Sequence, residues 1–495
     1  MTTLPPSHHQ NPTTTESEMS FHHKSPRATT TAATRSSFFS PKLSVYLCSI
    51  CVTLFIVSNI KILQTPLPSS SKSLSFLHNW QEKLTTYDDS PPSCDPDLES
   101  MGDKLRESVT FLPLKDLRFA NAALVGHTWF MSSLYDTQEE GEVQYQQFPS
   151  KSSDGRILCI KGHDNHDGSW NYYALAYPGF LPKNATLVTG RTFVSYNHYD
   201  FGNIWHGLSS LVPFVAWHLK SECALPTRWI LYHWGEVRTG MSPWLNTLME
   251  ATFGGPMNIE KYDDAGDEQS TFCYEEAVVM RHNEGGMSRE KRMGVYDLIR
   301  CKARTMCGAE LDRTDGEIGL TLLMRTGPRS FRDETAVVGI FERECKKVEN
   351  CRLRVAYSSN LTICEQVKLM GSTDVLVSPH GAQLTNLFLM DRNSSVMEFY
   401  PKGWLKLAGV GQYVYKWIAS WSGMKYEGSW RDTDGELCPY PDDDRRCMSI
   451  YKNGRIGYNS TYFAEWTSKV LNEVKIRKFE EASKGNIIPT RCACS

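Results

Sequence analysis

Residues 374–401 read DVLVSPHGAQLTNLFLMDRNSSVMEFYP, and this stretch decides the fold class. The apolar run Val375–Val377 has the length of a buried strand, and a loop rich in small residues follows it. Leu384–Met390 then predicts a helix, and Val396–Tyr400 predicts another buried strand. A strand, a helix and a strand in this order are typical of an α/β domain with parallel strands.

The same alternation extends upstream of this stretch. Ile318–Met324 and Leu353–Tyr357 read as strands, and Glu334–Cys345 and Ile363–Leu369 read as helices. Repeated units of this length predict a parallel sheet covered by helices. In open sheets of this kind, ligands bind beyond the carboxyl ends of the strands, where helix amino termini offer free N–H groups. We therefore expect the functional site in the loops that follow the strands.

The loop after Met324 reads RTGPRSFRDE and is rich in arginine. It carries Arg325, Arg329 and Arg332 at the end of a predicted strand. Guanidinium groups can grip two phosphate oxygens at once, so this loop predicts a phosphate-binding site. The alternative, which we weigh about equally, is a solvated basic loop that pairs with the acidic residues just after it, Asp333 and Glu334.

The loop after Val377 reads SPHGAQLTN, and its small residues would let a ligand approach the backbone. The residues that could contact a ligand there are Ser378, His380, Gly381, Ala382 and Thr385. The alternative for His380 is a helix cap or a core histidine. Glu398 stands in an apolar strand, so it either meets a ligand hydroxyl or pairs internally. Neither loop has the glycine pattern of a dinucleotide site or a P-loop.

The middle of the chain predicts a second α/β lobe. Arg228–Trp234 and Glu276–Met280 read as strands, and Leu208–Leu219 reads as an apolar helix. Asn203 and His206 stand just before this helix, and a polar pair at the entrance of an apolar element suggests the wall of a site. The alternative is a helix cap with a packed histidine.

Two acidic segments look like metal motifs but fail the required pattern. HDNHDG at residues 163–168 has His163 in place of the first Asp of a calcium loop and lacks the closing Glu. Asp432 and Asp434 resemble the acidic metal motif of some nucleotide-sugar transferases, but no apolar strand precedes them. We expect a polar turn in the first case, a surface turn in the second, and no metal site.

The first hundred residues differ from the rest of the chain. Residues 1–42 are rich in Thr, Ser, Pro and His, which predicts a disordered cytosolic tail. Residues 43–60 carry no charge and predict a transmembrane signal anchor, with a cleaved signal peptide as the competing interpretation. Basic residues are more frequent before the span than after it, which favours type II topology. Residues 61–100 then predict a lumenal stem, and we expect lobes at residues 101–312 and 313–495, the second with a C-terminal extension.

Cysteines and glycosylation acceptors agree with a lumenal domain. Of the 15 cysteines, two (Cys48 and Cys51) lie in the predicted span, so 15 − 2 leaves 13 beyond it. Short loops could be closed by pairing Cys301 with Cys307, Cys345 with Cys351, and Cys438 with Cys447. All the N-glycosylation acceptors also follow the span, at Asn184, Asn360, Asn393 and Asn459. This layout is typical of Golgi membrane enzymes that act on glycans.

Composition excludes several classes of protein. Hydrophobic residues make up 40% and charged residues 22% of the chain, so most of it can bury a core. Lys and Arg total 53 against 56 for Asp and Glu, giving a net charge of −3. No global basic field exists to attract nucleic acid, so we expect no nucleic-acid partner.

The string DVLVSPHGAQLTNLFLM followed by VMEFYP resembles the signature segment of glycosyltransferase family 61. A looser match takes in the NxxH motif that begins at Asn203 and the arginine loop. The resemblance implies a two-lobed GT-B fold in the Golgi or endoplasmic reticulum, and an inverting enzyme that uses a UDP-sugar without an essential metal. The sugar would be xylose, arabinose or GlcNAc, and the acceptor a cell-wall polysaccharide such as xylan or a glycoprotein glycan. The resemblance assigns Arg325 and its neighbours to the diphosphate, the segment from His380 to Ala382 to the nucleotide end, and Glu398 to the nucleoside.

Inverting transfer also needs a general base that takes the proton of the acceptor hydroxyl. Members of that family usually carry a carboxylate four residues after the NxxH histidine, where this chain has Ser210. We expect His206 to be the base, with Asp200 and Glu236 as further candidates. One rival function is a catalytically silent glycan- or UDP-sugar-binding membrane protein, which Ser210 favours. Another is a carbohydrate esterase, although no GxSxG motif occurs and Ser378 precedes a proline.

Overall fold

The computed structural model describes residues 96–119, 141–162, 164–196, 202–260, 270–280, 287–309, 316–484 and 492–494. The predicted tail, the predicted signal anchor and most of the predicted stem lie outside these ranges. Contacts separate Met1–Ser93 from Cys94–Ser495, and the described residues all belong to the second unit. Of the helices within the described ranges, none combines the length and the apolar character that a membrane crossing requires.

The amino-terminal part of this unit contains an eight-stranded mixed sheet. Its strands are β1 (Leu112–Pro113), β2 (Tyr145–Phe148), β3 (Ile157–Lys161), β4 (Tyr172–Ala176), β5 (Ala185–Tyr196), β6 (Arg228–His233), β7 (Glu236–Arg238) and β8 (Thr271–Met280). The order is β1-β4-β3-β8-β5-β6-β7, and β2 pairs with β8 off this path. Only β5 with β6 and β5 with β8 pair in parallel among these strands. The prediction of further α/β structure in the middle of the chain is therefore confirmed, in the form of a second, mixed sheet.

Three long helices follow strands of this sheet: α4 (Ile204–Lys220), α5 (Pro243–Phe253) and α6 (Arg289–Met306). The side chain of Asn203 caps α4 by accepting a hydrogen bond from Trp205 N at 3.1 Å. The helix therefore begins four residues before the apolar run that predicts it. The shorter elements are α3 (Pro96–Glu107), η1 (Leu114–Phe119), η3 (Lys151–Ser153) and η4 (Gly168–Trp170).

The carboxyl-terminal part contains a five-stranded sheet in which every pairing is parallel. Its strands are β9 (Ile318–Met324), β10 (Cys351–Tyr357), β11 (Val375–Pro379), β12 (Ser395–Tyr400) and β13 (Lys425–Arg431), in the order β10-β9-β11-β12-β13. The predicted parallel sheet is confirmed, and β9 has the predicted bounds. The helices are α7 (Glu334–Lys346), η6 (Ser358–Asn360), α8 (Ile363–Gly371), η7 (Ala382–Leu389), α9 (Trp404–Leu407), η8 (Gly409–Tyr413), α10 (Val414–Ser422), α11 (Asp444–Asn453) and α12 (Ser460–Lys484).

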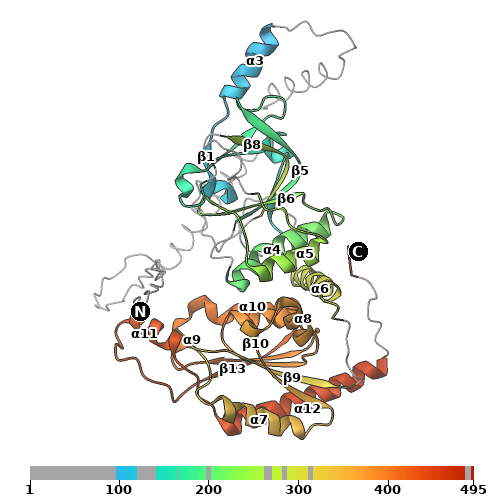
Figure 1. The fold of residues 1–495 in the computed structure, drawn as a ribbon, viewed down its shortest axis with the longest axis vertical. Coiled ribbons are helices and arrows are strands. Elements are labelled where there is room, and N and C mark those ends of the chain that lie inside the picture. Colours follow the sequence, from blue (N-terminus) through green and yellow to red (C-terminus); the bar gives the residue numbers. More distant parts are fainter. Residues whose placement is uncertain are drawn as a thin grey trace, which may run out of the picture. The chain divides into compact units, whose positions relative to one another are not determined.

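Helices cover both faces of this parallel sheet. Figure 1 shows α7 and α12 together on one face and α8 and α10 on the other. Alternate residues of β9 supply the two layers: Leu320 and Leu322 belong to the core cluster that includes α7 and α12, whereas Leu323 belongs to the cluster that includes η7 and α10. A strand buried on both faces in this way reads as a continuous apolar run, which is why its bounds could be predicted.

One predicted element differs in type. Leu384–Met390 was expected to be an α-helix, but Ala382–Leu389 forms the 3-10 helix η7. Two side-chain amides bond into the backbone there: Gln383 Nε2 donates to Pro379 O at 2.7 Å, and Asn386 Nδ2 donates to Gln383 O at 3.1 Å. These bonds tie the chain into a tighter turn. Over so few residues, the apolar spacing of the two helix types is nearly the same.

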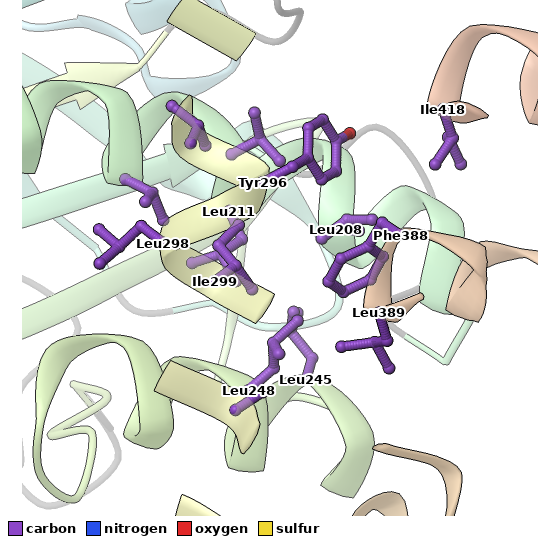
Figure 2. Close-up of a cluster of buried hydrophobic side chains, with 14 of the residues drawn as sticks. Leu208, Leu211, Leu245, Leu248, Tyr296, Leu298, Ile299, Phe388, Leu389 and Ile418 are labelled. Atoms are coloured by element: carbon purple, nitrogen blue, oxygen red, sulfur yellow. The ribbon is translucent and has the colours of Figure 1, made fainter. Parts of the chain in front are cut away.

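One apolar core joins helices of the amino-terminal part to the carboxyl-terminal part. Figure 2 shows its side chains converging from α4, α5, α6, η7 and α10: Leu208, Leu211, Leu245, Leu248, Tyr296, Ile299, Phe388, Leu389 and Ile418. The core is supplemented by a polar contact in which Trp244 Nε1 donates to Asn386 Oδ1 at 3.2 Å. The helices that follow the first sheet therefore pack directly on η7, the element that carries the predicted nucleotide loop.

Six disulfides lie within the described residues. They pair Cys159 with Cys273, Cys223 with Cys494, Cys301 with Cys492, Cys307 with Cys364, Cys345 with Cys351, and Cys438 with Cys447. The predicted pairing of Cys301 with Cys307 is wrong because both cysteines find partners that are distant in sequence. The bond to Cys492 spans 191 residues, and a separation of that size leaves no trace in local spacing.

Candidate active site

Arg325 and Arg329 leave the carboxyl end of β9 and lie half-buried in the arginine loop. Arg325 Nη1 donates to His380 O at 3.1 Å, while the Nε atoms of both arginines are buried without a hydrogen-bond partner. Among the described residues, neither guanidinium forms an ion pair with a carboxylate. The backbone of the loop is held in place, since Arg329 N donates to Gly454 O at 3.0 Å.

Burial acts on the charges of these two arginines. Burial, together with the positive charge of Arg329, lowers the pKa of Arg325 to about 10. Burial also lowers the pKa of Arg329, while the nearby Tyr415 opposes the shift in both arginines. Both groups stay cationic at neutral pH, so the loop holds two positive charges that no protein carboxylate neutralises within the described chain. An anionic ligand would supply the missing countercharge.

Arg332 has a different role from its two neighbours. Its Nη2 pairs with Asp432 Oδ2 at 2.9 Å, and Asp432 also accepts hydrogen bonds from Gly457 N and Asp434 N. Arg332 is therefore a paired arginine, as in the alternative interpretation of this loop, but its partner is neither Asp333 nor Glu334. The expectation of a surface turn at Asp432 is also wrong in one respect, because this carboxylate is only 3% exposed.

The loop after β11 meets the arginine loop at Gly381. A Cβ atom at Gly381 would overlap Arg325 Nη1 and Gln383 Oε1, so only glycine leaves room for the guanidinium. Ser378 and Pro379 belong to β11 and not to the loop, and the buried Ser378 hydroxyl donates to Leu323 O at 2.8 Å. Thr385, in η7, is fully buried, and its hydroxyl interacts with that of Tyr415.

His380 and Glu398 form a buried pair beside this junction. His380 Nδ1 lies 2.5 Å from Glu398 Oε1, and Glu398 Oε2 accepts a hydrogen bond from the Tyr426 hydroxyl at 2.7 Å. Glu398 is fully buried and pairs with other side chains of the protein, which is one of the two roles that the sequence predicts for it. Because the carboxylate accepts at Nδ1, the remaining ring nitrogen of His380, Nε2, is the one that can serve a ligand.

Aromatic rings enclose this pair. The imidazole of His380 stacks on Tyr400 with a centroid distance of 4.8 Å and meets Tyr415 edge to face at 5.3 Å. Burial, with the charge of Glu398, raises the pKa values of Tyr400, Tyr415 and Tyr426. All three phenols therefore keep their protons at neutral pH and can act only as neutral donors or acceptors. His380 is thus buried, as in the alternative of a core histidine, and it is also part of a polar cluster that adjoins the arginines.

Both of these loops fall within one match to a known protein family. The family model described as Glycosyltransferase 61 matches residues 238–397. The chain carries a glycosyltransferase family 61 domain. The family is one of transferases that move a sugar from a donor to an acceptor, so the protein is a glycosyltransferase. No curated protein matches the chain.

The family 61 match contains both loops of the candidate site. It begins at the end of β7 and ends within β12, one residue before Glu398. Arg325, Arg329 and His380 lie inside the match, whereas Tyr415 and Tyr426 lie beyond it. Sequence reasoning missed these two tyrosines because they come from α10 and β13. The one available signal was the polar hydroxyl of Tyr415 among the apolar residues of the segment that forms α10.

The candidates for the general base lie in the other part of the glycosyltransferase. His206 is in the first turn of α4, where its ring contacts Trp205 at a centroid distance of 4.4 Å. Glu236 lies in β7 and accepts a hydrogen bond from Arg238 Nη2 at 2.6 Å, and Asp200 falls outside the described residues. The hydroxyl of Ser210 is buried and donates to Gly207 O at 2.8 Å within α4.

The segments with possible metal ligands are structured by their own hydrogen bonds. Asp164 Oδ1 accepts from His166 N and Asp167 N at 2.7 and 2.8 Å, and these bonds lower its pKa, whereas His163 is outside the described residues. His218, Cys223 and Cys494 also lie close together, but the two cysteines form a disulfide and so offer no thiolate.

The predicted glycosylation acceptors are all exposed. Asn184, Asn360, Asn393 and Asn459 lie at turns or at ends of helices, where an oligosaccharide chain would meet no packed core. Together with the six disulfides, this exposure fits a protein of the secretory pathway.

Proposed function

We propose that this glycosyltransferase is an inverting, UDP-sugar-dependent enzyme with a GT-B-type arrangement of its two sheets. The observation that carries the proposal is the pair of half-buried arginines without carboxylate partners at the end of β9. In an open parallel sheet, that edge is where ligands bind. A nucleoside diphosphate is a ligand whose charge would complete this site.

In the proposed reaction, an acceptor hydroxyl attacks the anomeric carbon of the donor as the C–O bond to UDP breaks. Negative charge then builds on the diphosphate, and Arg325 and Arg329 stabilise it. The proton of the acceptor hydroxyl passes to a base on the other lobe, for which His206 remains our first candidate, with Asp200 and Glu236 after it and Asn203 as part of the acceptor wall. The arginines make an essential metal ion unnecessary in this mechanism.

We assign the nucleotide end of the donor to the segment from His380 to Ala382. Nε2 of His380 is the side-chain polar group there that remains available to a ligand, and Thr385 lies behind it against Tyr415. Glu398 acts through His380, since its own oxygens are occupied by His380 and Tyr426. The Ser378 hydroxyl donates a hydrogen bond to a backbone oxygen of β9, so this side chain stabilises the fold. An esterase nucleophile at this position is therefore disfavoured.

Xylose, arabinose and GlcNAc are the donor sugars that we propose, with a cell-wall polysaccharide such as xylan or a glycoprotein glycan as the acceptor. The test is product analysis of the full-length chain with a panel of labelled UDP-sugars, alongside calorimetric titration with UDP. Arg325→Ala should lose both transfer and UDP affinity, whereas Arg352→Ala, an exposed arginine on β10, is the matched control and should lose neither. Unchanged UDP binding in a folded Arg325→Ala protein would remove the proposed site.

The rival function, a protein that binds a UDP-sugar without transferring it, is favoured by the buried Ser210 hydroxyl in place of a carboxylate. The same experiment separates the two. A binding protein should take up UDP and show no product with any donor, and its UDP affinity should still fall in Arg325→Ala. An enzyme should show a transfer rate that falls together with the affinity.

We propose a type II Golgi membrane setting, with residues 43–60 as the anchor and the described residues in the lumen. The six disulfides and the exposed acceptor asparagines support the lumenal placement. Digestion with an N-glycosidase should lower the apparent mass of protein made in a secretory host. An unchanged mass would contradict the lumenal placement.

Metal independence follows from the same mechanism and has its own test. Transfer should survive exhaustive chelation with EDTA, because the two arginines supply the positive charge that a divalent ion would otherwise provide. Loss of transfer in EDTA, with recovery on adding a divalent cation, would contradict the assignment of the diphosphate to the arginines alone.

A further inference from the structure

Three aromatic side chains follow one another along the outer side of α10. Tyr413, Trp417 and Trp421 are spaced four residues apart, so they fall on one side of the helix. The rings of Tyr413 and Trp417 have centroids 5.9 Å apart, and those of Trp417 and Trp421 are 6.1 Å apart with planes within 17°. Eight residues of helix rise about 12 Å, so this aromatic row has the length of a short oligosaccharide.

Two of the three rings, those of Tyr413 and Trp417, are not part of the core, whereas Trp421 packs against its edge. The opposite side of α10 carries the buried residues Val414, Tyr415, Ile418 and Ala419, which pack into the shared core. Tyr413 is 44% exposed and Trp417 is 38% exposed, while Trp421 is partly buried. Large exposed aromatic rings in a row incur a solvation cost that a soluble surface avoids unless the rings have a ligand.

The row also begins beside the candidate donor site. Tyr415 comes two residues after Tyr413, on the buried side of α10, and packs its ring against His380. It also lies close to the positive charges of Arg325 and Arg329. The residue before Tyr413, Gln412, accepts a hydrogen bond from the Tyr400 hydroxyl at 3.1 Å. At its far end, Trp421 lies under Arg292 of α6, with the guanidinium carbon 5.0 Å from the ring centroid. The row therefore runs from the vicinity of the His380 cluster, to which Gln412 and Tyr400 connect it, toward α6.

We propose that Tyr413, Trp417 and Trp421 form the binding platform for the sugar rings of an oligosaccharide acceptor. The C–H bonds on one face of a pyranose ring form an apolar surface with slight positive charge, and this surface matches the negative face of an aromatic ring. Lys416 and Ser420 are exposed next to the rings and can bond the equatorial hydroxyls of the same sugars. A saccharide chain fits both features.

This inference rests on the proposed transfer to a glycan, which requires an acceptor beside the donor. The rings would hold the sugar units behind the acceptor end, and the terminal hydroxyl would then lie toward the arginines. The row therefore sets how strongly a long acceptor binds, whereas it leaves the binding of UDP unchanged.

The experiment uses calorimetry on the full-length chain, with xylohexaose and chitohexaose as separate probes and UDP as a third titrant. Trp417→Ala should weaken the binding of at least one hexasaccharide by roughly ten-fold or more, the scale of one lost stacking contact. Trp417→Phe should recover most of that loss, and UDP affinity should stay the same in both variants. Trp170→Ala is the matched control, since this tryptophan of η4 is 64% exposed and lies on a different element.

Equal hexasaccharide affinity in the wild-type protein and a folded Trp417→Ala protein would overturn the proposal. Absence of binding of both hexasaccharides to the wild-type protein would overturn it as well. The UDP titration keeps the two proposals apart, because a protein that binds a hexasaccharide through Trp417 but does not bind UDP would contradict only the donor site.

Discussion

Arg300 and Arg304 on α6 and Arg325 and Arg329 after β9 are two pairs of at least half-buried arginines, but the pairs differ in their partners. Arg300 donates to Asp297 at 2.6 Å, to Phe388 O at 2.8 Å and to Ser422 O at 2.9 Å. Arg304 pairs with Asp391 at 2.6 Å and donates to Leu389 O at 2.7 Å. Burial lowers the pKa of Arg300 to about 10, as it does for Arg325.

The α6 arginines have carboxylate partners within the protein, whereas the arginines after β9 have none within the described residues. The α6 pair joins α6 to η7 and the end of α10, and its charges are neutralised by carboxylates of the protein itself. The pair after β9 is half-buried and has no carboxylate, so its desolvation is not offset within the described chain. Burial alone therefore does not mark a candidate binding arginine, whereas burial without a countercharge does.

The largest expected effect comes from replacing one arginine of each pair by methionine, which has a similar shape and no charge. Arg300→Met should lower the free energy of unfolding by about 2–4 kcal/mol, because it leaves two buried carbonyl oxygens without their donor, while Asp297 keeps its second partner, Arg392. Arg325→Met should change it by only about 1 kcal/mol, because a buried charge and a single hydrogen bond disappear together. Denaturant unfolding of both variants measures this difference, and equal losses would break the comparison.

The second effect concerns the geometry of the charge at Arg325. Lysine keeps the positive charge but loses the fork that grips two oxygens, so Arg325→Lys should fold normally and lose roughly 2–4 kcal/mol of transition-state stabilisation. Transfer rate at saturating donor, measured beside UDP affinity, is the readout. The control is Arg352→Lys on β10, which should keep the wild-type rate. A full rate in Arg325→Lys would show that only charge matters there.

The third effect tests whether the Glu398 carboxylate pairs with His380 and not with the arginines. Glu398→Gln keeps the shape of the side chain but removes the charge from two short hydrogen bonds, so the free energy of unfolding should fall by about 1.5–3 kcal/mol. Glu334→Gln is the control, since Glu334 accepts a bond from the Tyr357 hydroxyl at the edge of α7. Its loss should be smaller because solvent reaches that site, and the reverse order would contradict the buried pair.

The smallest effect is expected at the junction of the two loops. Gly381→Ala should weaken UDP binding several-fold with a stability change of about 1 kcal/mol or less, because the new methyl group displaces the flexible end of Arg325. Gly339→Ala in α7 is the matched control, and it should leave UDP affinity unchanged and stabilise the helix slightly. Wild-type UDP affinity in Gly381→Ala would mean that the position of the Arg325 guanidinium is not critical.

Local patterns in the sequence were enough for much of the carboxyl-terminal fold. The bounds of β9 match the prediction, and α7, α8, β10, β11 and β12 lie within a few residues of theirs. Except for β10, whose residues are half-buried or exposed, each of these elements buries a face, so its apolar period is visible without any partner. The two loops of the candidate site were also found in this way, since both follow apolar strands and both combine residue types that suit phosphate.

Tertiary structure decided which residues within those loops remain available to a ligand. Arg332 is paired because Asp432, 100 residues away, reaches it, while Arg325 and Arg329 meet no such carboxylate in the described chain. Tyr415 and Tyr426 surround His380 and Glu398 only because α10 and β13 pack there. The disulfide between Cys301 and Cys492 likewise joins residues that are distant in sequence. Residue order alone determines local periodicity, but partners distant in sequence are set by how the whole core packs, because only that packing brings their side chains within bonding distance.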